Sequence, residues 1–212
     1  MESPLNSTAV DDLLAQSAIT KTTEFSDKLR AVLHKIPRLN FVPEEHKDQA
    51  YGEELIPLEL GQTLLPLPVV AAALAALEIN SNDSVLEVGT GNGYTTACLT
   101  QLADHVTSIE IYPQLLASAG KQLAMMGIFN AHIHHMSLTD LLADPMHEGQ
   151  YDVVLVTGST LTEPAGLREL LRDSGRLFVV TGEPGSAMLI QRTGTDFAET
   201  RLFDISLPAL EL

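Results

Sequence analysis

The stretch Val85-Leu86-Glu87-Val88-Gly89-Thr90-Gly91-Asn92-Gly93-Tyr94 joins a short apolar run, three glycines at alternate positions and the start of a helical pattern. It predicts a strand, a tight turn and a helix. Glycines let the backbone turn sharply and let a ligand lie against the bare chain. The start of the helix adds unpaired N–H groups. The stretch therefore predicts a binding site at the end of a strand.

The spacing of the glycines narrows the class of ligand. A Walker phosphate loop needs a lysine after its last glycine, but Tyr94 and Thr95 follow Gly93. A dinucleotide fingerprint reads Gly-x-Gly-x-x-Gly, whereas this turn reads Gly-x-Gly-x-Gly. Glu87 would repel a pyrophosphate but can help to hold the amino group or the positive sulfur of S-adenosylmethionine. The pattern favours S-adenosylmethionine, and two alternatives stay open: an NAD-dependent oxidoreductase, and a plain turn with Glu87 facing solvent.

Composition and charge exclude several classes of protein. The chain has 212 residues, of which 45% are hydrophobic, enough for one domain with a sizeable core. Its net charge of −16 with only 12 Lys and Arg argues against nucleic-acid binding. The longest apolar stretch, residues 64–77, is shorter than the roughly 20 residues that span a membrane. One cysteine, Cys98, and no basic, apolar leader indicate a cytoplasmic protein.

The first third of the chain reads as an extension of helices and loops. Residues 1–9 are polar and predict a frayed terminus. Apolar residues at helical spacing predict an amphipathic helix over residues 25–36 that Pro37 stops. The alanine-rich residues 68–77 are apolar on nearly all sides and predict a buried helix.

Beyond the glycine turn, strands alternate with helices. Residues 106–111 predict a second strand, which brings Glu110 to the place where a carboxylate binds ribose hydroxyls. Residues 113–126 predict a helix closed by Gly127, and residues 131–136 predict a third strand. That strand carries His132, His134 and His135, for which the sequence favours a surface or core role over metal binding because no cysteine lies near.

The last third predicts the rest of the sheet. Residues 151–158 form a continuous apolar run typical of a strand buried on both faces. A short helix over residues 164–171, ended by Gly175, is predicted to precede a strand over residues 176–181. Residues 187–192 and 200–207 predict an antiparallel hairpin at the sheet edge.

These elements together predict an α/β fold. We expect a Rossmann-like, doubly wound sheet of seven strands, as in methyltransferases, with a C-terminal antiparallel hairpin. The predicted organisation is a helical and loop extension over residues 1–80 packed on an S-adenosylmethionine-binding core over residues 81–212.

The chain resembles the protein-L-isoaspartate O-methyltransferases. The resemblance covers most of the chain and is carried by Ile36-Pro37-Arg38, Phe41-Val42-Pro43, Ala50-Tyr51, Pro57, Gly61-Gln62-Thr63, Leu86-Glu87-Val88-Gly89-Thr90-Gly91 with Gly93-Tyr94, Ser108-Ile109-Glu110 and Val156-Thr157. It implies an enzyme that moves the methyl group of S-adenosylmethionine onto the α-carboxylate of an isoaspartyl residue in a damaged protein. Its partner would be a protein or peptide substrate, and no metal would be needed.

The resemblance also implies roles for individual residues. Thr63 would be the catalytic residue, and Thr63 and Thr157 would lie near the transferred methyl. The S-adenosylmethionine site would comprise Glu87, Gly89, Thr90, Gly91, Asn92, Gly93, Glu110, Ile111, Ser137 and Leu138. The substrate site would comprise Leu58, Glu59, Leu65, Thr157 and Gly158.

Three positions depart from the family pattern. The serine that the family uses in catalysis is Leu65 here, which cannot donate a hydrogen bond. The aspartate that meets the adenine amino group is Ser137, and Glu59 adds a negative charge beside a site for a carboxylate. A second interpretation therefore stays open: a diverged relative that methylates another small acid or binds a partner without catalysis.

Overall fold

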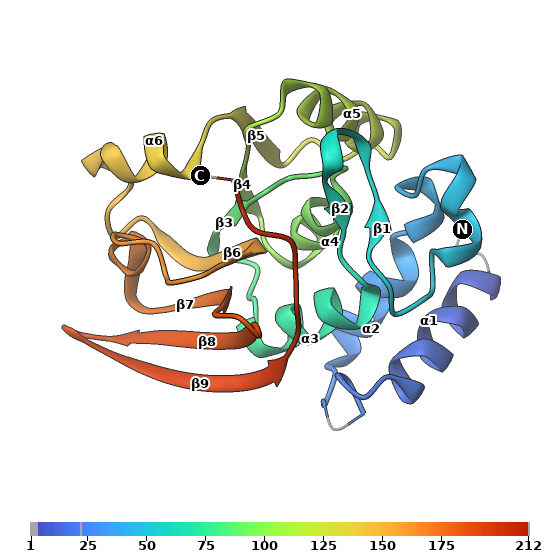
Figure 1. Cartoon of the computed structure of the whole chain (residues 1–212), viewed down its shortest axis with the longest axis horizontal. Coiled ribbons are helices and arrows are strands. Elements are labelled where there is room, and N and C mark those ends of the chain that lie inside the picture. The colour runs from blue at the N-terminus through green and yellow to red at the C-terminus, as the bar shows by residue number, and fades with distance from the viewer. Residues whose placement is uncertain (1–3, 22, 212) are drawn as a thin grey trace.

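The computed structural model describes residues 4–21 and 23–211 of the chain. A seven-stranded sheet lies at its centre in the order β5-β4-β3-β6-β7-β8-β9 (Figure 1). The strands are β3 (Ser84–Val88), β4 (His105–Glu110), β5 (Ala131–His135), β6 (Tyr151–Thr160), β7 (Leu171–Thr181), β8 (Ser186–Thr193) and β9 (Asp196–Asp204). Strands β5, β4, β3, β6 and β7 are parallel to one another, and β8 and β9 continue the sheet in antiparallel pairing. The predicted fold class is confirmed.

Helices and a small hairpin surround this sheet (Figure 1). The described α-helices are α1 (Pro4–Gln16), α2 (Asp27–Lys35), α3 (Leu67–Leu77), α4 (Tyr94–Leu102), α5 (Pro113–Met125) and α6 (Leu138–Ala143). The hairpin pairs β1 (Ile56–Pro57) with β2 (Thr63–Leu64). Short 3-10 helices occur at Arg38–Asn40, Glu44–Gln49, Glu59–Gly61, Pro145–His147 and Arg168–Leu170. The helices predicted for residues 25–36, 68–77 and 113–126 are present with small shifts of their ends.

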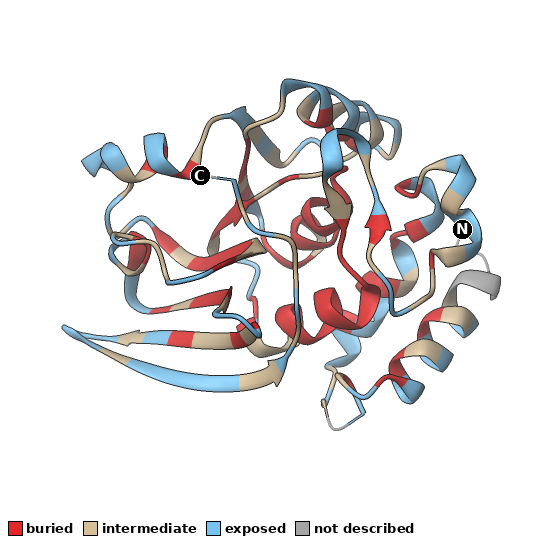
Figure 2. Cartoon of the chain, viewed as in Figure 1, coloured by how far each residue is buried: buried red, intermediate tan, exposed pale blue. Residues whose placement is uncertain are grey.

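The central strands are buried on both faces. Val153 and Leu155 of β6 join the hydrophobic cluster that includes α2, α3 and α4, whereas Val154 and Val156 join the cluster that includes α6. Side chains alternate across a strand, so a strand that is apolar at every position serves both clusters. Figure 2 shows this burial along the central strands and in α3, in contrast to the exposed strand β9.

The first 80 residues pack on the sheet through a shared core. Val10 of α1 and Leu33 of α2 belong to the same hydrophobic cluster as Val85 of β3 and Val153 of β6. The extension therefore depends on the sheet for burial of its apolar face. A boundary at residue 80 stays a prediction, because this cluster crosses it without a break.

The predicted frayed start of the chain is wrong over its described part. Residues 1–3 lie outside the described residues, but α1 begins at Pro4. Val10 and Leu14, four residues apart on one helix face, are 1% and 3% exposed. This apolar stripe packs against α2 and stabilises the helix more than its polar neighbours disfavour it. Proline is also well tolerated in the first turn of a helix.

The helix predicted for residues 164–171 is not formed. Arg168–Leu170 make only a 3-10 turn, and β7 already begins at Leu171. Gly166 has φ +92°, which interrupts a helical path. The Arg168 guanidinium donates hydrogen bonds to both carboxylate oxygens of Glu163 at 2.7 Å, which holds the segment as a loop. Gly175 lies within β7 and does not end a helix.

The C-terminal hairpin is confirmed, with its second strand displaced from the predicted position. The prediction placed this strand at residues 200–207, whereas β9 spans Asp196–Asp204. Thr193 pairs directly with Asp196, and Gly194 has φ +63°, as a two-residue hairpin turn requires. Residues 205–211 therefore leave the sheet. Figure 1 shows this segment, in red, running from β9 back toward β3 and β4.

Ser26 is expected to stabilise α2 by capping its N-terminus. Its hydroxyl oxygen accepts a hydrogen bond from the Leu29 N–H at 3.2 Å. Ser26→Ala is expected to lower the free energy of unfolding by about 1 kcal/mol, because an N–H at the helix start loses its partner. Urea unfolding measures the change, and Ser26→Asp, which keeps an acceptor, serves as the control. Equal losses in both variants would contradict a capping role.

Among the residues that the structure describes, no helix combines the length and the hydrophobicity needed to cross a bilayer. The single cysteine, Cys98, lies fully buried in α4, as expected of a small apolar residue. Burial raises the pKa of its thiol to about 12, so the side chain is neutral at physiological pH.

Candidate functional site

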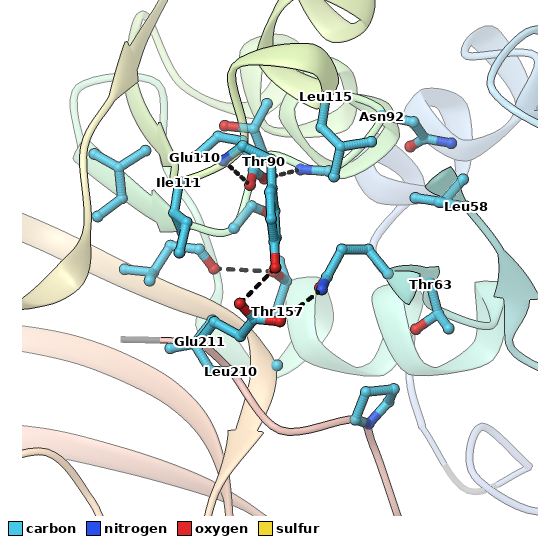
Figure 3. Close-up of a pocket in the computed structure, with 18 of the residues that line it drawn as sticks. Leu58, Thr63, Thr90, Asn92, Glu110, Ile111, Leu115, Thr157, Leu210 and Glu211 are labelled. Carbon is cyan, nitrogen blue, oxygen red and sulfur yellow. Dashed lines mark hydrogen bonds between the residues drawn. The ribbon is translucent and has the colours of Figure 1, made fainter. Parts of the chain in front are cut away.

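A pocket lies at the carboxyl ends of β3, β4 and β6, where open parallel sheets bind ligands (Figure 3). Twelve residues predicted for the site line it: Leu58, Thr63, Leu65, Gly89, Thr90, Gly91, Asn92, Glu110, Ile111, Leu138, Thr157 and Gly158. Four predicted residues do not line it: Glu59, Glu87, Gly93 and Ser137. Most of the residues predicted for the site therefore gather around this one pocket.

The glycine turn is built against the second strand of the sheet. The N–H groups of Gly89 and Thr90 both donate to the Ile109 carbonyl, at 2.9 and 3.1 Å. Gly89 and Gly91 have φ values of +95° and +54°, which favour glycine. A Cβ on Gly89 would lie 2.2 Å from Thr157 Oγ1, so this glycine also makes room for β6.

Gly93 is the N-cap of α4, with φ +89°, and it does not line the pocket. A Cβ at this position would lie 3.1 Å from the Cβ of Ala119 in α5. The third glycine therefore permits close packing of the turn on a helix. Its predicted contact with the ligand stays a prediction.

Glu110 is an acidic residue in the pocket wall. Its Oε2 accepts a hydrogen bond from the Gly91 N–H at 2.8 Å, and its Oε1 accepts one from the Tyr112 N–H at 3.0 Å. The residue is only 5% exposed, so these two bonds fix the carboxylate in place. Each oxygen keeps an unused lone pair, which suits a ligand with two neighbouring hydroxyl groups.

Glu87 faces away from the pocket, which corrects its predicted contact with the ligand. Leu86 and Val88 join one hydrophobic cluster and Glu87, between them, points to the opposite face. There its Oε2 accepts hydrogen bonds from the hydroxyls of Thr96, at 2.5 Å, and Ser108, at 2.6 Å. Burial raises the pKa of Glu87 to about 8, and the two hydroxyl groups offset only part of this effect.

Two side chains tie the N-terminal extension to the pocket. Asn92 Nδ2 donates to the Phe41 carbonyl, and Asn92 Oδ1 accepts from the Tyr94 N–H at 3.3 Å. The buried Arg38 donates to the carbonyls of Ala50, at 2.7 Å, and of Leu65. The extension therefore positions both the glycine turn and the segment that follows β2.

Thr63, Leu65 and Thr157 lie in the pocket wall, as predicted. The Thr157 hydroxyl is shared between the carbonyls of Val88, at 2.9 Å, and Gly89, at 2.8 Å, so it fastens β6 to β3. The Thr63 hydroxyl makes no hydrogen bond to any residue that the structure describes, and it remains available to a ligand. Leu65 is 7% exposed and gives the wall an apolar surface.

Ser137 and Glu59 lie outside the pocket wall, and their predicted contacts with ligands stay predictions. The Ser137 hydroxyl accepts from the Asp140 N–H at 3.0 Å and donates to the Asp140 carboxylate at 2.8 Å, so it caps α6. The Ser-x-x-Asp spacing is a capping signal that the sequence carried. Glu59 is exposed and outside the pocket, where solvent and salt screen its charge. The repulsion expected from Glu59 is therefore reduced.

Several wall residues were missed from the sequence: Gln62, Leu64, Val88, Thr95, Ile109, Tyr112, Leu115, Met136, Pro208, Ala209, Leu210 and Glu211. Tyr112 had a local signal, because it follows Glu110 at the strand end. Residues 208–211 had none, because they reach the pocket only through the return of the chain after β9. Leu210 packs on Gly158, where a Cβ would lie 3.0 Å from the leucine Cβ.

The three histidines of β5 lie outside the pocket. All three are exposed, and His135 Nε2 lies 2.9 Å from the Ile111 carbonyl oxygen. Within the described part of the chain, no three His, Cys, Asp or Glu side chains are grouped so that they could hold a metal ion.

The comparisons with known proteins agree on one family. Residues 9–201 match the profile of the family described as Protein-L-isoaspartate(D-aspartate) O-methyltransferase (PCMT). A protein-L-isoaspartate O-methyltransferase of Aliivibrio fischeri (strain MJ11) is 33% identical over 189 residues, which cover 89% of this chain and 87% of that protein. Its counterpart in Roseiflexus castenholzii (strain DSM 13941 / HLO8) is 33% identical over 199 residues, which cover 93% and 88%.

A solved structure shares the fold over nearly the whole length. It is a Plasmodium falciparum protein described as a protein-L-isoaspartate O-methyltransferase, in complex with S-adenosyl-L-homocysteine. The two superpose with a TM-score of 0.82 at 18% sequence identity, covering 97% of this chain and 98% of that one. The match over residues 9–201 and the identity to curated relatives show that this chain belongs to the protein-L-isoaspartate(D-aspartate) O-methyltransferase family.

Proposed function

We propose that this chain transfers the methyl group of S-adenosylmethionine to the α-carboxylate of isoaspartyl residues in damaged proteins and so begins their repair. The observation that carries the proposal is the position of Glu110. This fixed carboxylate faces a pocket between the glycine turn and the β1–β2 hairpin, in a chain of this family.

The donor side of the pocket fits an adenosyl group. The Glu110 carboxylate would bind the two ribose hydroxyls, because each oxygen keeps a lone pair after the bonds from Gly91 and Tyr112. The bare backbone of the glycine turn would lie under the methionyl part. Ile111, Leu115 and Leu138 provide an apolar wall of the kind that an adenine ring contacts.

The acceptor side needs no strong base. When bound, S-adenosylmethionine supplies a methyl group on a positively charged sulfur, which a carboxylate oxygen takes while the bonding electrons stay on the sulfur. A carboxylate with a pKa near 4 is already ionised at neutral pH. The work of the chain is therefore to align the two groups and to exclude water, which contributes up to about 7–11 kcal/mol in the best-oriented cases. Thr63 and Leu65 would line the path of the acceptor.

Leu65 allows a direct test of the missing hydroxyl. Its carbonyl is held by Arg38, so replacing the side chain leaves the backbone anchored. Leu65→Ser is expected to raise kcat/KM for an isoaspartyl peptide about tenfold, because one hydrogen bond to a charged group contributes about 1.5–3 kcal/mol. Leu65→Ala removes the same bulk without adding a hydroxyl and serves as the control. If the serine variant is no faster than the alanine variant, the hydroxyl is not what limits the rate.

Methyl transfer to a synthetic isoaspartyl peptide tests the activity itself. We expect methyl ester to form on that peptide and not on the same sequence with a normal aspartyl bond. A homologous enzyme with known activity, assayed in parallel, validates the peptide. If no ester forms although calorimetry shows micromolar binding of S-adenosylmethionine, the diverged-relative interpretation replaces this proposal, as Leu65 would favour. If S-adenosylmethionine fails to bind at millimolar concentration, the chain is a binding module.

We also propose a cytoplasmic location, where damaged proteins would be the partners. The single cysteine is buried and has no role that needs an oxidising compartment. An NAD-dependent oxidoreductase is not supported, because the glycine turn lacks the Gly-x-Gly-x-x-Gly spacing of dinucleotide-binding proteins.

A further inference from the structure

Residues 207–211 form a strap across the mouth of the pocket. The Ser159 N–H donates to the Pro208 carbonyl at 3.0 Å, and the Leu210 N–H donates to the Ser159 carbonyl at 2.7 Å. The Ser159 hydroxyl adds a bond to the Leu207 carbonyl at 2.7 Å. These bonds anchor the strap on β6 and bring Glu211 to the pocket.

Glu211 is held by one donor on each of its carboxylate oxygens. The Tyr112 hydroxyl donates to Oε2 at 2.5 Å, and Gln62 Nε2 donates to Oε1 at 3.2 Å. Figure 3 shows the Glu211 side chain directed into the pocket. The hydrogen bond to Glu211 raises the pKa of Tyr112, so its hydroxyl remains protonated as a donor. Gln62 and Tyr112 thus form a two-point carboxylate clamp.

The clamp joins the two sides of the site. Gln62 precedes Thr63 in the β1–β2 hairpin, on the side where the acceptor would approach. Tyr112 follows the β4 strand, and its N–H is bound by Glu110. With Glu211 in the clamp, the cavity volume is about 80 Å³. Pockets for small molecules usually measure about 300–1,000 Å³, so little space is left beside Glu211 in this arrangement.

We propose that Gln62 and Tyr112 bind the carboxylate of the methyl acceptor, and that Glu211 occupies the same clamp as an internal competitor. The inference rests on the proposed function for the identity of the acceptor. Its physical basis is that the clamp already holds a carboxylate beside the pocket, with a separate donor for each oxygen. An acceptor must displace Glu211, so the strap would exclude carboxylates that bind the clamp more weakly than Glu211 does.

The first experiment removes the competitor. Glu211→Ala is expected to tighten binding of an isoaspartyl peptide about threefold to tenfold, since two exposed hydrogen bonds no longer compete. Calorimetry on protein saturated with S-adenosylhomocysteine measures this without turnover. Glu169→Ala, which removes an equal charge from an exposed site away from the pocket, is the control. The affinity for S-adenosylhomocysteine is expected to change less than twofold in the Glu169→Ala control.

The second experiment separates a shared clamp from a simple plug. In the Glu211→Ala background, Tyr112→Phe is expected to weaken peptide binding about threefold to tenfold, because the acceptor carboxylate loses one donor. A version of the peptide with an α-carboxamide in place of the carboxylate is expected to show no such change. If Tyr112→Phe has no effect in this background, Glu211 only blocks the mouth and the clamp assignment is overturned.

S-adenosylmethionine also carries a carboxylate, on its methionyl part. The same variants show whether the clamp binds this carboxylate or that of the methyl acceptor. If Glu211→Ala tightens S-adenosylhomocysteine and leaves the peptide unchanged, the clamp belongs to the donor and the proposal fails. Glutarate, a small dicarboxylate without an isoaspartyl bond, tests the clamp independently of the substrate. Glutarate binding that requires Tyr112, without peptide binding, would support the clamp and refute the proposed acceptor. No binding of either probe to the Glu211→Ala variant would overturn the clamp.

Discussion

Glu110→Ala is expected to weaken binding of S-adenosylhomocysteine by about 100-fold. The carboxylate is positioned by the N–H groups of Gly91 and Tyr112, and its free lone pairs would accept hydrogen bonds from both ribose hydroxyls. Each hydrogen bond to a charged group contributes about 1.5–3 kcal/mol, and about 1.4 kcal/mol corresponds to a factor of ten in affinity. Calorimetry measures the loss directly.

A control must show that the loss of S-adenosylhomocysteine binding comes from the missing carboxylate and not from unfolding of the protein. Glu110→Ala also leaves the Gly91 N–H without its partner, so thermal unfolding should be measured beside binding. Glu169→Ala, an exposed acid outside the pocket, should bind S-adenosylhomocysteine like the unchanged protein. A folded Glu110→Ala protein that binds within threefold of the unchanged protein would show that the ribose does not contact this carboxylate.

Glu87 is expected to make the stability of the protein fall as the pH rises. Burial raises the pKa of this carboxyl from 4.5 to about 8, so the folded state holds a proton that the unfolded state releases. Its favourable contribution is complete below pH 4.5 and is lost progressively up to about pH 8. At about 1.4 kcal/mol per pKa unit, the whole change amounts to about 4–5 kcal/mol.

Glu87→Gln isolates this contribution because the amide does not titrate. Its carbonyl oxygen can still accept from Thr96 and Ser108, as Glu87 Oε2 does. The stability of the glutamine variant relative to the unchanged protein is expected to increase by about 4 kcal/mol between pH 4.5 and pH 8.5. Urea unfolding across this range measures the difference, and Glu169→Gln is the exposed control. A difference that stays constant with pH would mean that Glu87 is ionised in the folded protein.

Much of the site could be read from the sequence because its signals are local. The run from Val85 to Tyr94 encodes a strand, a turn and a helix within ten positions, and the structure forms all three. Glu110 was placed by its distance from the glycines along the chain. The alternation of side chains along β3 also indicated on which face of the sheet Glu87 lies, since Leu86 and Val88 belong to one face and Glu87 to the other.

The remainder of the site depends on contacts that sequence patterns do not encode. Residues 208–211 reach the pocket after the chain has passed through β8 and β9, so nothing near Glu211 indicates that it meets Tyr112. The helix α1 was missed for a similar reason. Its polar composition disfavours a helix, and only packing of Val10 and Leu14 on the core reveals why it forms.

The bond from Asn92 to the Phe41 carbonyl has a consequence for how this fold can be recombined. One of the pocket's own residues fastens the first lobe of the chain, and Arg38 supports the opposite wall from that same lobe. The nucleoside-binding half therefore cannot be exchanged between proteins independently of the N-terminal lobe. In a chimera with a foreign N-terminal lobe, the glycine turn would lose the hydrogen bond that holds it to that lobe. The chimera would keep this support only if it also contained residues 38–50.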